Sequence, residues 1–304
     1  MRVQLIGEGE QGIQQPRGDA QDAYRLISIP FDLDDKSPAA VFSDDFGDYN
    51  NTNWRLYEVG PNQQRIEFAQ IDSILSGKGY WLIVKDGGRF DSGIGTTNGT
   101  DQKYRILLHR GWNLIGNPFN FEIPLAHLSL STGEMVVLRS YGGAWNSLTA
   151  APVTAMQPFA GYAINIRNAA ILSIDPDLSE GLASDVDAHP AGDYAHVLRA
   201  YEQSAWSIRI VAHSQNARDS DTFAFALAGA SRGADIFDAP EPPAVGEYVS
   251  VYFVQDDWLQ ALAIDARPEP MHGDVWPLVV ETTIRDVVDL TFEGIENVPP
   301  QFGV

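Results

Sequence analysis

The sequence contains no cysteine among its 304 residues. This absence excludes disulfide bonds, thiolate nucleophiles and metal sites built on sulfur ligands. It leaves the cellular compartment open, because exported bacterial proteins and cytosolic proteins can both fold without disulfides. The compartment therefore has to be inferred from other features of the sequence.

Basic residues are scarce. The chain has 20 Lys+Arg against 41 Asp+Glu, which gives a formal net charge of −21. A surface of this sign repels the phosphates of nucleic acids and the headgroups of anionic lipids. We therefore expect neither nucleic acid nor a membrane surface among the partners. The charge favours solubility and divalent cations instead.

Long hydrophobic runs are also missing. Residues 1–6 lack the apolar core of a signal peptide, and the longest apolar stretch, residues 223–230, is too short to cross a bilayer. The six histidines show no His-x-x-x-His spacing, so the sequence does not indicate a histidine-ligated metal. We expect no membrane insertion.

The residues that are abundant favour a mostly β fold. Aromatic residues make up 11% of the chain and occur with 27 Gly and 18 Pro, a composition typical of short strands joined by tight turns. The sequence predicts consecutive β-sandwich-like units, the first two of which form an internal repeat. The expected parts are an N-terminal strand and linker (1–20), β repeat 1 (21–100), β repeat 2 packed with it (101–176), a linker (177–192) and a C-terminal β-sandwich (193–304).

Few helices are expected. Residues 37–42, with a proline near the first turn, predict one short helix in the first repeat. Residues 121–130 are the expected counterpart in the second repeat. Residues 195–200 are expected to form the first strand of the C-terminal unit.

The internal repeat is based on two motifs that recur in the same order. The first copy has residues 24–31 (YRLISIPF) followed by residues 77–84 (GKGYWLIV), and the second has residues 111–119 (GWNLIGNPF) followed by residues 159–166 (FAGYAINI). A period of this size indicates a duplicated module. We expect the two copies to share one topology.

This pair of motifs resembles a module common in large secreted or surface-displayed bacterial proteins, where a "GWNLIG-P" strand is paired with a "G-GYW" strand. The resemblance covers about residues 21–176, and the second copy departs from it with Ala163 where the first has Trp81. Residues 193–304 are similar to the domain that precedes the type IX secretion sorting domain in the same proteins. The resemblance implies a place outside the cell or on its surface, export signals and adjoining domains outside this chain, and no chemistry of its own.

One catalytic motif is matched without its usual context. Residues 229–233 (GASRG) fit a nucleophile elbow around Ser231, and Asp265 and His272 follow in the order of a triad. The elbow requires a helix directly after the serine. Residues 234–243 contain three prolines instead, so we predict a glycine-rich loop and no enzyme.

Acidic side chains gather in several turns, where carboxylates and nearby carbonyls are the ligands that calcium prefers. None of these turns matches an EF-hand loop, and solvated turns without an ion are the alternative. No other cofactor is expected. The calcium candidates are Asp32, Asp34, Asp35, Asp219, Asp221, Asp235 and Asp238.

Three tryptophans next to turns, Trp54, Trp145 and Trp258, are candidates for stacking on sugar rings, with burial in the core as the alternative. The sequence as a whole predicts a non-catalytic structural or display module that acts by spacing, self-association or adhesion. The competing hypothesis is a carbohydrate-binding β-sandwich module of a secreted enzyme, with glycans as ligands. The expected partners are adjoining domains of a larger parent protein or copies of the chain, joined by β-edge pairing. Residues 1–6 are the first candidate strand, and residues 3–6 are expected to pair with a sheet edge either of their own chain or of a neighbouring copy.

Overall fold

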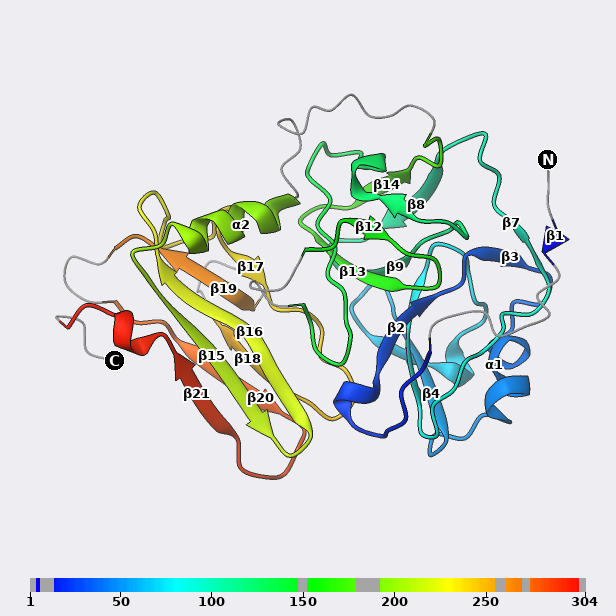
Figure 1. The fold of residues 1–304 in the computed structure, drawn as a ribbon, viewed down its shortest axis with the longest axis horizontal. Coiled ribbons are helices and arrows are strands. Elements are labelled where there is room, and N and C mark those ends of the chain that lie inside the picture. Colours follow the sequence, from blue (N-terminus) through cyan, green and yellow to red (C-terminus); the bar gives the residue numbers. More distant parts are fainter. Residues whose placement is uncertain are drawn as a thin grey trace. The chain divides into compact units, whose positions relative to one another are not determined.

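The computed structural model describes residues 4–5, 14–146, 152–178, 192–254, 261–269 and 274–300. The chain forms two compact units: residues 1–19, 23–143 and 153–189 make the first, and residues 20–22, 144–152 and 190–304 the second. The fold is mostly β, as predicted, and the described residues contain two α-helices (Figure 1). No helix in these ranges is both long and apolar enough to span a membrane.

The first unit is built from short strands and one α-helix. Its strands are β1 (Gln4–Leu5), β2 (Arg25–Ser28), β3 (Phe31–Leu33), β4 (Trp54–Val59), β5 (Arg65–Glu67), β6 (Gly79–Val84), β7 (Gly95–Thr97), β8 (Tyr104–Leu108), β9 (Gly111–Gly116), β10 (Ile123–Pro124), β11 (Leu128–Leu130), β12 (Ala155–Met156), β13 (Gly161–Ile166) and β14 (Ala170–Ile174). Its helix is α1 (Pro38–Phe46), and the 3₁₀ turns η2 (Phe68–Gln70) and η3 (Leu125–His127) belong to the same unit. A further 3₁₀ turn, η1 (Gln21–Ala23), precedes β2.

The first copy of the repeat is a four-stranded sheet in the order β2-β6-β4-β5. All six residues of β6 are buried, which agrees with their nearly continuous apolar sequence. The predicted short helix is present as α1, which begins where the Ser37 hydroxyl accepts a hydrogen bond from the Ala40 amide and ends at Gly47 with a φ of 77°. Phe42 on this helix packs its ring against that of Trp54, 5.8 Å away.

The N-terminal strand pairs within its own chain. Gln4 lies opposite Thr96 and Leu5 opposite Gly95, so β1 extends the sheet that β7 forms with β3. Residues 3 and 6 of the predicted strand lie outside the described residues. The expected pairing with a sheet edge is confirmed for β1, and the edge belongs to the same chain.

The second copy contains the pair β9–β13, the sheet β11-β14-β8 and the short pair β10–β12. The helix predicted over residues 121–130 is wrong, because this segment forms β10, η3 and β11. Pairing with other strands decides the difference, since Ile123 lies opposite Met156 and Leu128 lies opposite Ile174.

The two copies use the same strand pairing, which confirms the internal repeat. Ile27 lies opposite Tyr80 in the first copy, and Ile115 lies opposite Tyr162 in the second. Both tyrosine hydroxyls accept a bond from a backbone amide five residues earlier, that of Leu75 at 2.9 Å for Tyr80 and that of Gln157 at 2.8 Å for Tyr162. Repeat members separated by about eighty residues thus occupy equivalent environments.

Backbone contacts between the copies are reciprocal. Ile27 of the first copy forms a β-bridge to Ala160 of the second, and Ile115 of the second forms one to Lys78 of the first. The Ser28 amide donates to the Phe159 carbonyl at 2.9 Å, and the equivalent Gly116 amide donates to the Gly77 carbonyl at 3.0 Å. Each Gly-Tyr strand is therefore joined to the first motif of the other copy.

Two equivalent glycines allow this approach. A Cβ atom placed on Gly79 would lie 2.8 Å from the carbonyl oxygen of Ile115, and one on Gly161 would lie 2.7 Å from that of Ile27. Both contacts are with backbone, which cannot rotate away. Glycine is thus required at both positions.

The copies differ where Trp81 is replaced by Ala163. In the first copy β4 pairs with β6 along several residues, including Tyr57 opposite Trp81. In the second copy one bridge remains at the matching place, between Arg139 and Ala163. Tyr141 of the second copy contacts Trp81 of the first copy edge to face, with ring centroids 4.8 Å apart. The larger side chain of the first copy therefore packs against a residue of the second.

The second unit contains one curled sheet and the helix α2 (Gly192–Glu202) (Figure 1). Its strands are β15 (Trp206–Ser214), β16 (Ala217–Ala226), β17 (Ala239–Pro240), β18 (Val249–Phe253), β19 (Leu262–Arg267), β20 (Leu278–Thr282) and β21 (Asp289–Glu293). They follow the order β20-β18-β19-β16-β15-β21, with β17 on β19, and the 3₁₀ turn η4 (Ile295–Asn297) follows β21. The parallel pairing of β19 with β16 places β19 inside the sheet.

The strand predicted over residues 195–200 is wrong, because these residues belong to α2. Val197 and Ala200 are buried and lie three positions apart, which matches one face of a helix. Tyr201 packs its ring edge against Phe223 of β16, with centroids 5.5 Å apart. Packing of this face on the sheet therefore decides the conformation.

Candidate functional site

Three carboxylates converge in the second unit. Asp219, Asp221 and Glu241 each offer an oxygen atom that lies within 4.8 Å of those of the other two. Asp219 and Asp221 are two of the predicted calcium candidates, whereas Glu241 was missed. Its sequence signal, an acid within the proline-rich link, does not show that its carboxylate comes close to those of β16.

The acidic cluster lies at the part of the sheet where β19 no longer lies between β16 and β18. β19 pairs with Phe223 and the following residues of β16, and the part of β16 before Phe223 has no such partner. Side chains make the connection there: Asp219 Oδ2 accepts from the Val251 amide at 2.5 Å, and the Thr222 hydroxyl donates to the Val251 carbonyl at 2.6 Å. The Asp219 carboxylate thus substitutes for part of a strand ladder.

The electrostatics of the cluster are unfavourable for full ionisation. Asp219 and Asp221 are 6% and 4% exposed. Burial, followed by the nearby charge of Asp221, raises the pKa of Asp219 well above its usual value. Glu241 accepts a bond from the Ser250 hydroxyl at 2.6 Å. The arrangement can hold a hard cation on its oxygens or retain a proton among them.

The first predicted acidic turn is a solvated surface turn. Asp32, Asp34 and Asp35 are exposed and belong to no group of three converging metal-ligand side chains among the described residues. Asp32 pairs with Lys36 at 2.6 Å. The Ser37 amide donates to Asp35 at 2.9 Å, and this bond lowers the pKa of Asp35.

The last predicted pair braces a loop against the sheet. Asp238 accepts from the Asp235 amide at 2.8 Å and from the Ala266 amide at 2.9 Å, and so ties the proline-rich link to β19. Burial raises the pKa of Asp238 to about 7 despite these two bonds. The structure does not bring Asp235 and Asp238 into a group of three ligands among the residues described.

A second acidic group was not predicted. Asp44, Asp45 and Asp91 of the first unit have converging oxygens on the surface, and Asp45 accepts from the Asp91 amide at 2.7 Å. Exposed acidic groups of this kind are common without an ion. The group arises because the end of α1 meets a loop far along the chain, which no local pattern indicates.

The structure describes two of the three tryptophan candidates, Trp54 and Trp145. Trp54 is 1% exposed and its indole donates to the Gly47 carbonyl at 3.0 Å, so the prediction that it stacks on glycans is wrong. Trp145 is half-buried, and its indole donates to the Pro243 carbonyl at 3.3 Å. Trp258 lies outside the described residues.

Ser231 lies in an exposed turn. Its hydroxyl donates to the Gly233 carbonyl at 2.5 Å, and its amide donates to Asp235 at 2.7 Å. Turn and extended residues follow it where an elbow would require a helix. His272, the histidine of the matched triad order, lies outside the described residues.

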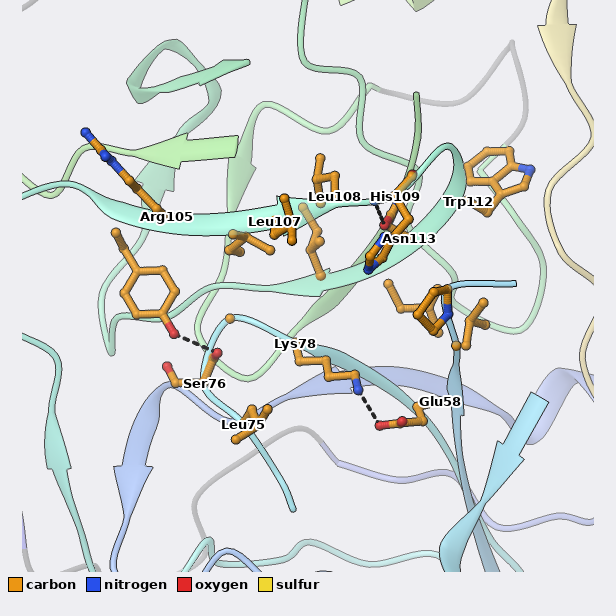
Figure 2. Close-up of a pocket in the computed structure, with 18 residues that line it drawn as sticks. Glu58, Leu75, Ser76, Lys78, Arg105, Leu107, Leu108, His109, Trp112 and Asn113 are labelled. Atoms are coloured by element: carbon orange, nitrogen blue, oxygen red, sulfur yellow. Dashed lines mark hydrogen bonds and ion pairs between the residues drawn. The ribbon is translucent and has the colours of Figure 1, made fainter. Parts of the chain in front are cut away.

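A surface pocket of about 330 Å³ lies in the first unit, between parts of the two repeat copies. β8 borders one side of it, and Lys78 and Glu58 of the first copy lie on another (Figure 2). The Lys78 ammonium pairs with Glu58 at 2.5 Å, and the Tyr104 hydroxyl donates to the Ser76 carbonyl at 2.8 Å. The sequence did not predict this pocket, because its walls come from segments that meet only after the copies pack together.

No family model, curated protein or solved structure matches the chain. Function therefore has to be argued from the residues themselves. The acidic cluster has a structural role through its bonds to backbone amides, whereas the pocket is open to solvent and combines apolar with basic side chains.

Proposed function

We propose that the chain is a non-catalytic structural or display module of an exported bacterial protein, acting through its surfaces and sheet edges. The observation that carries the proposal is the reciprocal bridging of the two repeat copies, from Ile27 to Ala160 and from Lys78 to Ile115. This arrangement supports a rigid spacer, because residues of the two recurring motifs hold the copies together. The resemblance of the motifs to modules of surface-displayed proteins supports the same role.

The groups with catalytic potential also support a structural role. Buried Asp219 and Asp238 each accept bonds from two backbone amides, which fixes segments of the second unit. The Ser231 hydroxyl donates to a carbonyl and lies in a turn without the helix of a nucleophile elbow. A carbohydrate-binding module is the weaker alternative, since Trp54 is buried in the core.

We expect Ser231→Ala to leave catalysis unchanged and to change stability little. The wild-type chain and the variant should fail equally to hydrolyse chromogenic esters and glycosides, and their melting temperatures should differ by about 4 °C at most. The lost hydrogen bond is exposed, and its net contribution to stability is at most about 1 kcal/mol. An activity present in the wild type and lost in the variant would contradict the non-catalytic proposal.

Display is tested by protease treatment of intact cells of the host that encodes the chain. We expect an antibody against residues 24–174 to lose its signal when intact cells are treated, because a displayed module is reachable from outside. A cytosolic protein of the same cells serves as the control and should persist. If the protease degraded the chain only after the cells were lysed, the result would contradict the proposal.

A further inference from the structure

The segment that borders the pocket is basic, in contrast to the rest of the chain. Residues 103–110 contain Lys103, Arg105, His109 and Arg110 and no acidic residue, although the chain as a whole has 20 Lys+Arg against 41 Asp+Glu. A group of surface charges of one sign favours the binding of a partner that carries charges of the opposite sign. This segment therefore marks a place where an acidic partner meets less repulsion than elsewhere.

The same segment includes an unpaired sheet edge. β8 is the last strand in the order β11-β14-β8 among the described residues, so one of its edges pairs with β14 and the other does not pair with a strand. All five residues of β8 line the pocket, and Figure 2 shows the strand running along it. An edge of this kind presents backbone N–H and C=O groups to which an extended segment can add.

Side-chain alternation gives the edge an apolar contact surface. Tyr104 and Ile106 pack against the core of the second copy, so Arg105 and Leu107 lie on the opposite face of β8. Leu107 is 66% exposed, and Leu75, which also lines the pocket, is 45% exposed. Exposed leucines on two walls of one pocket favour a ligand that carries apolar groups.

The charges that line the pocket leave a positive excess. Lys78, Arg105 and His109 are among the lining residues, and Glu58 is the acidic one. Glu58 already pairs with Lys78, and its side chain is 11% exposed. Arg105 is therefore exposed without a neighbouring carboxylate among the lining residues.

We propose that this pocket binds an extended acidic segment of a partner protein, which adds as a strand to the unpaired edge of β8. Its apolar side chains contact Leu107 and Leu75, and its carboxylates lie near Arg105. A peptide is favoured over a nucleic acid because an exposed strand edge recognises the backbone amides of another strand, which a nucleic acid lacks. The inference goes beyond the proposed function and does not depend on where the chain is displayed.

The test uses the full chain and two capped peptides, one of three Glu-Thr-Val-Thr repeats (the Glu–Val peptide) and the other of three Lys-Thr-Val-Thr repeats (the Lys–Val peptide), because this spacing places the charged and apolar side chains on one face of a strand, as Arg105 and Leu107 are. Isothermal titration calorimetry at about 0.15 M salt, which screens the attraction of a basic peptide to the acidic surface as a whole, should detect tighter binding of the Glu–Val peptide than of the Lys–Val peptide. Affinity for the Glu–Val peptide should fall as ionic strength rises from about 0.05 M to about 0.5 M, because salt screens exposed charges.

Two substitutions in β8 locate the site. Arg105→Glu reverses a lining charge and Leu107→Asp removes an exposed apolar contact, and each should weaken binding of the Glu–Val peptide at least about tenfold, equivalent to about 1.4 kcal/mol. Both side chains are exposed, so the melting temperature should stay unchanged. The matched control is Lys85→Glu, an equal change in charge at an exposed residue outside the pocket, which should bind as the wild type does.

Three results would overturn the proposal. The first is equal binding of the two peptides, and the second is Glu–Val binding that Arg105→Glu and Leu107→Asp leave intact. The third is tight binding of a ten-nucleotide uridine RNA together with no binding of the Glu–Val peptide. Any of these outcomes would leave the non-catalytic, displayed role intact, because turnover and surface exposure are measured separately.

Discussion

Valine in place of Gly79 or Gly161 is expected to lower the free energy of unfolding by about 3 kcal/mol or more. The added side chain would clash with backbone atoms, which cannot move aside without distorting the strands. The added Cβ atoms would lie 2.8 Å and 2.7 Å from the carbonyl oxygens of Ile115 and Ile27. These oxygens belong to the β-bridged segments that join the copies, so relieving the contact requires the copies to separate. Urea unfolding followed by tryptophan fluorescence measures the effect.

Gly142→Val is the matched control. Gly142 is exposed, has open space around its Cβ position and does not have a left-handed backbone, so valine there should cost little. Gly93 is a poorer control although its surroundings are also open, since its φ of 73° strains any side chain. A loss of stability in Gly142→Val as large as in the other two variants would show that the close approach is not the cause.

The second large effect is a dependence of stability on pH that runs opposite to ordinary acid denaturation. Burial raises the pKa of Asp238 to about 7, whereas an unfolded aspartate has a pKa near 3.8. A carboxyl with a raised pKa in the fold stabilises the folded state most at low pH, and this contribution is lost as the pH rises from about 4 through about 7. The shift corresponds to about 4 kcal/mol at most. Asp219, with its pKa also raised by burial, acts in the same direction.

The contribution of Asp238 is isolated by comparing the wild type with Asp238→Asn, because other carboxyls such as Glu67 have lowered pKa values and act in the opposite direction. The asparagine loses one of two acceptor oxygens, which costs a constant amount at every pH. The difference in free energy of unfolding between the two proteins should therefore shrink as the pH rises from 5 to 8. Asp48→Asn, at an exposed position, is the control. A difference that does not change with pH would refute the assignment.

The repeat was predictable because its motifs carry their own constraints. The Gly-Tyr strands need glycine for close approach and tyrosine for a bond to a loop amide, so both residue types appear at the same place in each copy. The mostly β fold followed from the same short apolar segments. These local patterns could be recognised because the same residues make the same contacts in each copy.

Other features depend on contacts that no local pattern shows. β19 was not predicted because it contains Asp265 and Arg267, two charged residues that are buried as an ion pair at 2.8 Å. Residues 195–200 of α2 were predicted as a strand because the apolar and polar positions in so short a segment fit the periodicity of a strand and of a helix equally well. Asp219 and Asp221 were found as a pair two positions apart, whereas Glu241 and the pocket beside β8 required the tertiary fold.

The reciprocal bridges have a consequence for what counts as a domain in this chain. Because the bridging amides of each copy, such as those of Ser28 and Gly116, donate to carbonyls of the other, one copy alone would leave these donors without their partners at an edge of its own sheet. The boundary near residue 100 thus separates two repeats and lies within one compact unit. The first unit resembles a dimer whose two halves are covalently joined. The outer surfaces of the two halves can differ in sequence, whereas the residues that bridge the halves have to be kept.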